Sequence, residues 1–157
     1  MPVLYLLLVF LHIAVMFAAV ALTYGPETLI LMSIRANNAA WLRGITIATE
    51  PLARYVPMLF GLAGIFGLLA AIAGSFNLLA PWLVIAYVIF LALSINGAVL
   101  TARNLTLMRN GLATVTDGPL PADVAAVANG ASFRFAAVLD FTLLLVVVFD
   151  MVVKPFS

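Results

Sequence analysis

Four long apolar runs, separated by short stretches that hold most of the charged residues, constrain the fold of this chain more than any other feature. Of the 157 residues, 66% are hydrophobic and 8% are charged, which is too much apolar surface for one water-soluble core. A bilayer core about 30 Å thick is crossed by about 20 apolar residues in a helix. We therefore predict a single integral membrane domain over residues 1–157, an all-α antiparallel bundle of four transmembrane helices.

The expected spans cover residues 3–24, 52–74, 81–102 and 133–153. The first helix is predicted to be long and kinked near Pro26, with an extension to residue 35, because Gly25-Pro26-Glu27 is typical of a helix restart. Pro57 is expected to bend the second span near its start. Residues 121–128 are expected to form a short surface helix, with Asp123 in its first turn.

The distribution of arginine predicts the topology. All six arginines lie in residues 35–54 and 103–134, two connections on the same side of a four-span protein. Cytoplasmic loops carry an excess of Lys and Arg, so both loops are predicted to be cytoplasmic and both termini to lie on the outer face. Glu27 and Glu50 are expected at the cytoplasmic rim among these arginines. Because topology explains the few cations and the net charge is only +1, no nucleic-acid partner is predicted.

Asp140 is the main polar candidate, because an Asp at a helix centre costs about 2.5–3.5 kcal/mol to insert into a membrane. At about 1.5 Å per residue, Asp140 and Asn96 both lie roughly 21–22 Å from the outer ends of their helices. Arg103 follows Asn96 by seven residues on the same helical face. We predict an Asn96–Arg103–Asp140 cluster. It would lock spans three and four together or carry a proton or cation; alternatively, Asp140 is interfacial and the fourth span begins later.

His12 is the only histidine and lies within the first span, with Met16 one helical turn later. One interpretation is a hydrogen bond to a neighbouring span, either to Tyr87 or to a backbone carbonyl. The other is a metal or haem ligand, because His and Met both bind copper and a homodimer would supply two histidines to one haem. At the outer end of the fourth span, Asp150 and Lys154 are expected to form a solvated pair.

Small residues repeat at helical spacing in the first two spans, where close helix contacts in membranes need them. The predicted packing positions are Ala14, Ala18, Ala21 and Gly25 in the first span and Ala63, Gly67 and Ala71 in the second. The chain contains no cysteine, no Gly-rich phosphate loop and no nucleophile–base–orienter set. These patterns favour assembly over catalysis.

Several short motifs carry a resemblance. They are Leu11-His12 in the first span, a Gly near its end, arginines in the first loop, and Gly61–Gly67 followed by Pro81-Trp82. The pattern resembles an uncharacterised bacterial family of predicted four-span integral membrane proteins, itself distantly similar to the copper-resistance protein D membrane domain. The resemblance implies a bacterial inner-membrane location and, through the distant relative, copper handling with His12 as the candidate residue.

The sequence favours a non-enzymatic integral membrane protein, an accessory or scaffolding subunit that acts through helix faces. Its expected partners are the lipid bilayer and other membrane helices, in a homo-oligomer or a larger membrane complex. No cofactor is predicted on this reading. The alternatives are a small-solute or proton-coupled transporter that uses Asp140, and a redox membrane protein that binds haem b, copper or quinone at His12.

Overall fold

The computed structural model describes residues 3–155, and these residues form helices joined by short turns. In chain order the elements are α1 (Val3–Arg35), α2 (Ala39–Ala53), α3 (Tyr55–Ala73), α4 (Pro81–Asn96), the π-helix η1 (Gly97–Thr101), α5 (Ala102–Leu112), α6 (Ala122–Ala128) and α7 (Ala131–Val153). α4, η1 and α5 follow one another without a break. The predicted all-α fold is confirmed, with no strand among the described residues.

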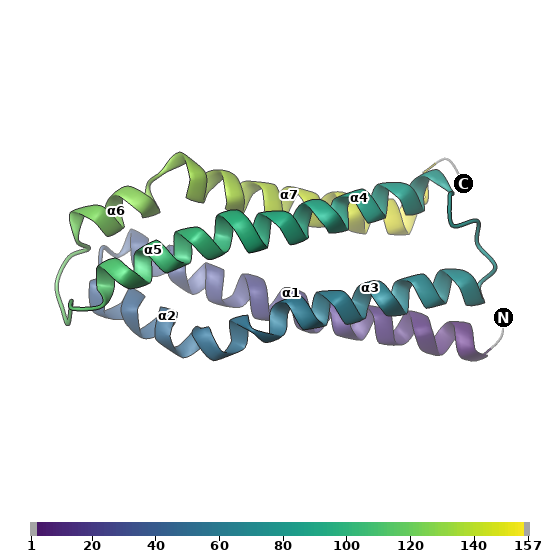
Figure 1. Ribbon diagram of the computed structural model, residues 1–157, viewed down its shortest axis with the longest axis horizontal. Helices are drawn as coiled ribbons and strands as arrows, with labels where there is room; N and C mark the ends of the chain where they lie inside the picture. Colours follow the sequence, from purple (N-terminus) through teal and green to yellow (C-terminus); the bar gives the residue numbers. More distant parts are fainter. Residues whose placement is uncertain (1–2, 156–157) are drawn as a thin grey trace.

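Four helical runs are long and apolar enough to cross a membrane. They are Val3–Arg35, Tyr55–Ala73, Pro81–Leu112 and Ala122–Val153. Their outward faces are apolar: Phe17 is 75% exposed and Val138 65% exposed, as expected for side chains whose solvent is lipid. Figure 1 shows the runs as an elongated antiparallel bundle. The described chain begins and ends at one end, here called the terminal end.

The prolines explain where the helices begin, break and continue. α1 runs through Pro26 to Arg35, as expected, although Pro26 removes one backbone hydrogen bond. Between α2 and α3 the helix breaks at Arg54, three residues before Pro57, because a proline ring clashes with the carbonyl four residues earlier. The predicted second span therefore began too early. Pro81 occupies the first turn of α4, where its missing N–H costs nothing.

The other end of the bundle, here called the arginine end, has its own hydrophobic core. This end comprises α2, α5, α6 and the adjoining ends of α1 and α7 (Figure 1). Its core contains Ile30, Ala39, Leu42, Ile45, Met108, Leu112, Val124, Ala128 and Phe133. The third helical run continues nearly three turns beyond its expected end at residue 102, to Leu112, and contributes Met108 and Leu112 to this core. The predicted surface helix is confirmed as α6.

The part of the bundle outside the arginine end is here called the apolar half, and its helices pack mainly as two pairs. α1 packs along α3, and α4 packs along α7. The second pair extends through η1, which also contacts α7. At the terminal end, Ala71 of α3 and Trp82 of α4 belong to one buried cluster that joins the two pairs. The polar side chains described next lie where the helices of these pairs come together.

Candidate functional site

A buried polar contact between two side chains joins α4 to α7. Asp140 is 7% exposed, and its Oδ1 accepts a hydrogen bond of 2.8 Å from Asn96 Nδ2. The same amide nitrogen donates to the backbone oxygen of Ala136, 3.0 Å away. Helix rise alone predicted that Asn96 and Asp140 lie at the same depth in the bundle, and in the structure they are directly hydrogen-bonded. A buried carboxylate needs such a donor, because a lost hydrogen bond leaves its desolvation uncompensated.

A second carboxyl group, from α1, belongs to this site. Asp140 lies within electrostatic range of Glu27 and of Tyr24, which are three residues apart on one face of α1. Glu27 was expected at the rim among arginines; its charged neighbour is Asp140, and it forms no ion pair with an arginine among residues 3–155. Glu27 lies just after Pro26 on the unbroken helix, eight residues before Arg35. We call Glu27, Asn96 and Asp140, together with Tyr24, the central polar site.

Arg103 is not part of the central polar site. Its side chain is exposed and lines a separate cavity of about 340 Å³ beside α6, together with Asn104 and Ser132. The predicted shared face assumed seven residues of regular α-helix between positions 96 and 103. Five of them form η1 instead, whose wider turns rotate the later residues away from that face. Among residues 3–155 the one ion pair joins Arg109 to Glu50, so no cation neutralises Asp140.

His12 fastens α1 to α3. Its Nδ1 lies 2.7 Å from the backbone oxygen of Ala63, and because a carbonyl only accepts, Nδ1 carries the hydrogen. The ring fits over Gly67, where an added Cβ would lie 2.9 Å from Nδ1. Of the two predicted partners, the backbone carbonyl is the one found. Met16 is half-buried one turn later, and no group of three His, Cys, Asp or Glu suited to a metal occurs among the described residues.

The small-residue positions fall on two kinds of surface. In α3, Ala63 and Ala71 are buried and Gly67 receives His12, so this stripe packs inside the chain. In α1, Ala14, Ala21 and Gly25 are exposed and Ala18 is half-buried. No atom lies within 4 Å of a Cβ built on Gly25. The α1 stripe is therefore open to lipid or to another helix.

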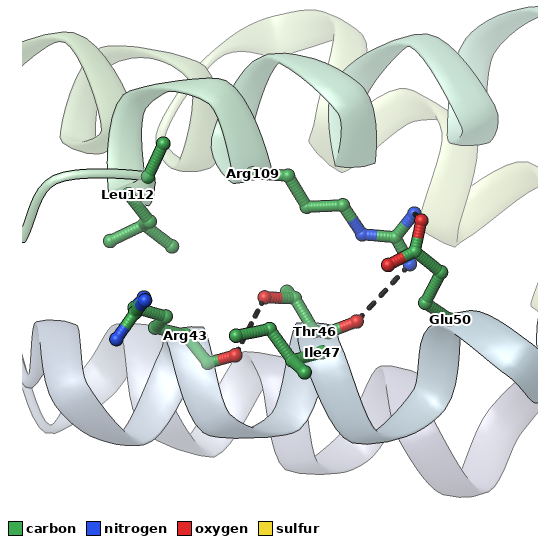
Figure 2. A pocket seen from close by; sticks show the side chains of 7 residues that line it. Arg43, Thr46, Ile47, Glu50, Arg109 and Leu112 are labelled. Carbon is green, nitrogen blue, oxygen red and sulfur yellow. Dashed lines mark hydrogen bonds and ion pairs between the residues drawn. The ribbon is translucent and has the colours of Figure 1, made fainter.

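A cavity of about 150 Å³ at the arginine end lies between α2 and α5 (Figure 2). Arg109 spans the gap: one guanidinium nitrogen donates to the backbone oxygen of Thr46 at 3.2 Å, and another lies 3.6 Å from Glu50 Oε1. In Figure 2 the Arg43 guanidinium points away from that of Arg109, so the two do not converge on one ligand. This contact ties the two arginine-bearing segments together.

At the terminal end the expected Asp150–Lys154 pair is wrong. Asp150 is buried, and neither of its carboxylate oxygens has a hydrogen-bond partner among the described residues. Lys154 Nζ lies over the rings of Phe76 and Trp82, 4.9 and 5.2 Å from their centres. Lys154 ends α7 in the left-handed conformation (φ 47°), which takes it off the helical face of Asp150. A cation–π contact replaces the ion pair.

Sequence reasoning had located two of the four residues of the central polar site. Tyr24 and Glu27 were not placed there, because the extension of the first helix to residue 35 was assigned to the rim and its rotation toward Asp140 was not predicted. The apolar run from Leu29 to Ile34 supported the extension to residue 35 but does not indicate which face of the helix Tyr24 and Glu27 occupy. Two carboxyl groups without a nearby cation can take up a proton or a metal cation, since either relieves their repulsion.

The four long apolar helices are those of a multi-pass integral membrane protein, and Asp140 is buried between two of them. Comparisons with protein-family models, with curated proteins and with solved structures find no match. Any statement of function therefore depends on the geometry of the chain itself.

Proposed function

We propose that this protein is a cation-coupled membrane transporter, and that Glu27 and Asp140 take up and release the coupling charge. One observation carries the proposal: among residues 3–155 the buried carboxyl group of Asp140 is held by an amide rather than by an arginine or lysine, and a second carboxyl group, Glu27 of α1, lies within electrostatic range of it. A carboxylate that served only as a lock would be best served by a cation. A pair that must bind and release a proton is better served by an amide, and Asn96 provides one.

The transported charge would cross between the terminal end and the arginine end. We place the arginine end in the cytoplasm, since both arginine-bearing connections lie there and Lys and Arg are retained on that side. The resemblance to bacterial four-span proteins supports a place in the bacterial inner membrane. The proton is the simplest coupling ion, because it needs no preformed coordination shell.

The test is proton flux in liposomes. Purified protein is reconstituted with a pH-sensitive dye inside, and a potassium diffusion potential drives proton entry. Wild type is expected to exceed empty liposomes, and Asp140→Asn and Glu27→Gln are expected to fall to the empty-liposome rate because neither amide binds a proton. Glu50→Gln is the matched control, since Glu50 is exposed at the arginine end. Equal flux in wild type and Asp140→Asn, with both variants folded by circular dichroism, would refute the proposal.

The second candidate function is an accessory subunit, and the open α1 stripe favours it. Ala14, Ala21 and Gly25 leave a shallow surface on which another helix could approach closely. The partner is a second copy of this chain or a helix of a larger membrane complex. The two functions are compatible, because transporters are commonly assembled from several subunits.

A photo-activated cross-linker tests the accessory role. The chain has no cysteine, so Ala21→Cys can be labelled at one position with a benzophenone reagent in native membranes. We expect Ala21→Cys to capture a partner, identified by mass spectrometry as this chain or another membrane protein. Val138→Cys on the exposed face of α7 is the control and is expected to capture only lipid. Lipid adducts alone at both positions would contradict the accessory role.

A further inference from the structure

The cavity of about 340 Å³ beside α6 lies where α5, α6 and the first turn of α7 meet. Its polar lining includes Arg103 and Asn104 of α5 and Ser132 of α7, and its apolar lining includes Leu107 and Val127. The volume is at the small end of the range for ligand sites, about 300–1,000 Å³. The cavity therefore has room for a small polar group of a ligand.

The charged group that lines this cavity is a cation. Arg103 is exposed and forms no ion pair with a carboxylate among residues 3–155. Asp123 of α6 lies elsewhere, because a Cβ built on Gly111 would be 2.8 Å from Asp123 Oδ2. Gly111 follows Arg103 by eight residues, about 12 Å along α5. The guanidinium of Arg103 is therefore available to an anionic ligand.

Neutral hydrogen-bond donors line the same cavity. Asn104 is 4% exposed, and its Nδ2 donates one hydrogen to Ser132 Oγ, 3.3 Å away. An amide has two N–H hydrogens, so a second remains for a ligand. Ala131 and Ser132 begin α7, whose N-terminus receives no side-chain cap from the part of the chain that the structure describes. Their backbone N–H groups have no partner within the helix. A guanidinium and N–H donors around one cavity are suited to a phosphate group.

The surface beside the cavity favours a lipid as the source of that phosphate. Arg103 comes directly after the expected end of the third span at residue 102, and Ser132 directly before the expected start of the fourth at residue 133. Lipid headgroups lie at this level, just outside the hydrocarbon core. Phe135 and Val138 follow Ala131 by four and seven residues on one face of α7, and they are 58% and 65% exposed. This face offers an apolar surface to the acyl chains of the same lipid.

We propose that this cavity binds the phosphate of an anionic phospholipid through Arg103, Asn104 and the first N–H groups of α7. Basic pockets between membrane helices on the cytoplasmic side bind anionic lipid headgroups in this way. A zwitterionic lipid fits less well, because its ammonium group would also lie near the guanidinium of Arg103. The cavity is separate from the central polar site, so lipid binding does not depend on the transport function.

Native mass spectrometry tests the proposal. Delipidated protein in mild detergent is titrated with phosphatidylglycerol, with phosphatidylcholine of the same acyl chains, and with glycerol 3-phosphate. We expect one saturable phosphatidylglycerol per chain, bound about tenfold more tightly than phosphatidylcholine, and no binding of glycerol 3-phosphate. Arg103→Gln is expected to weaken phosphatidylglycerol binding about tenfold. Arg35→Gln, which removes the same charge from an exposed position at the arginine end, is expected to bind as wild type does.

A second pair of variants leaves the charge of the protein unchanged. Ala126 lines the cavity, so Ala126→Phe is expected to fill part of it and to weaken phosphatidylglycerol binding. Ala122 is exposed one turn earlier on α6 and does not line the cavity. Ala122→Phe is therefore the matched control and is expected to leave lipid binding unchanged. Circular dichroism checks that all four variants are folded.

Four results would overturn the proposal. Equal weakening in Arg103→Gln and Arg35→Gln would mean a diffuse attraction to the arginine end instead of a site. Equal affinity for phosphatidylglycerol and phosphatidylcholine would mean that the acyl chains alone are bound. Glycerol 3-phosphate bound as tightly as phosphatidylglycerol would make the ligand a soluble phosphate. Unchanged phosphatidylglycerol binding in folded Arg103→Gln and Ala126→Phe would show that the lipid binds elsewhere.

Discussion

Replacing Gly67 with valine is expected to lower the free energy of unfolding in detergent by about 2–4 kcal/mol, from overpacking and a lost hydrogen bond. The first added carbon would lie 2.9 Å from His12 Nδ1 and 3.0 Å from Cε1. The imidazole must then move, which breaks its 2.7 Å hydrogen bond to Ala63. Because lipid gives no hydrophobic drive to pair helices, α1 and α3 depend on such close contacts. Unfolding by a graded detergent titration measures the change.

The same helix supplies the control for this prediction. No atom lies within 4 Å of a Cβ built on Gly61, so Gly61→Val makes the same chemical change without a collision and is expected to be nearly neutral. The double variant His12→Ala, Gly67→Val should be less unstable than the sum of the two single variants, because the alanine removes the clash. Two results would show that the His12 ring does not pack against Gly67. One is an equal loss of unfolding free energy in Gly61→Val and Gly67→Val. The other is strict additivity of the unfolding free energies in the double variant.

The spans and the Asn96–Asp140 contact could be predicted because both depend on quantities that hardly vary between helices. A membrane helix needs a certain apolar length, and a helix rises by a fixed distance per residue, so depth can be counted along the sequence. Two side chains at one depth on neighbouring helices then have a good chance of meeting. The hydrogen bond of 2.8 Å between them is the result.

Rotation about a helix axis was less predictable than depth. Nothing in Gly97–Thr101 announces a π-helix, yet that one irregularity moves Arg103 off the face of Asn96. The continuation of the first helix past Gly25-Pro26 was predicted, but the face of the helix on which Glu27 lies was not. Glu27 was therefore placed with the rim arginines, when it belongs with Asp140.

The core at the arginine end also escaped prediction. Its residues come from α2, α5 and α6 and from the ends of α1 and α7, and no single helix supplies more than three of them. Each short helix contributes only a few apolar side chains among polar ones. The core exists only once the long helices have brought these segments together. Its stability therefore has a different physical origin from that of the spans.

Leu42→Ala is expected to lower the free energy of unfolding by about 2–5 kcal/mol, because it weakens the core at the arginine end. Leu42 is fully buried in the core at the arginine end, where it contributes alongside Met108 and Val124. Removing its side chain leaves a cavity and returns apolar surface to water, a cost that does not arise for side chains facing lipid. The same detergent titration measures the loss. Ile47→Ala, on the same helix but with Ile47 54% exposed, is the matched control and should change little.

Hydrogen exchange locates this loss. In Leu42→Ala the amides of α2 and α5 should exchange faster, because local opening follows the weakened core. The amides of α4 and α7 around Asn96 and Asp140 should stay protected, since their contacts lie within the apolar half and do not involve Leu42. Faster exchange throughout the chain would instead mean that the arginine end and the spans unfold as one cooperative unit. If the amides around Asn96 and Asp140 stay protected while those of α2 and α5 exchange faster, α4 and α7 hold Asp140 in place independently of the core at the arginine end.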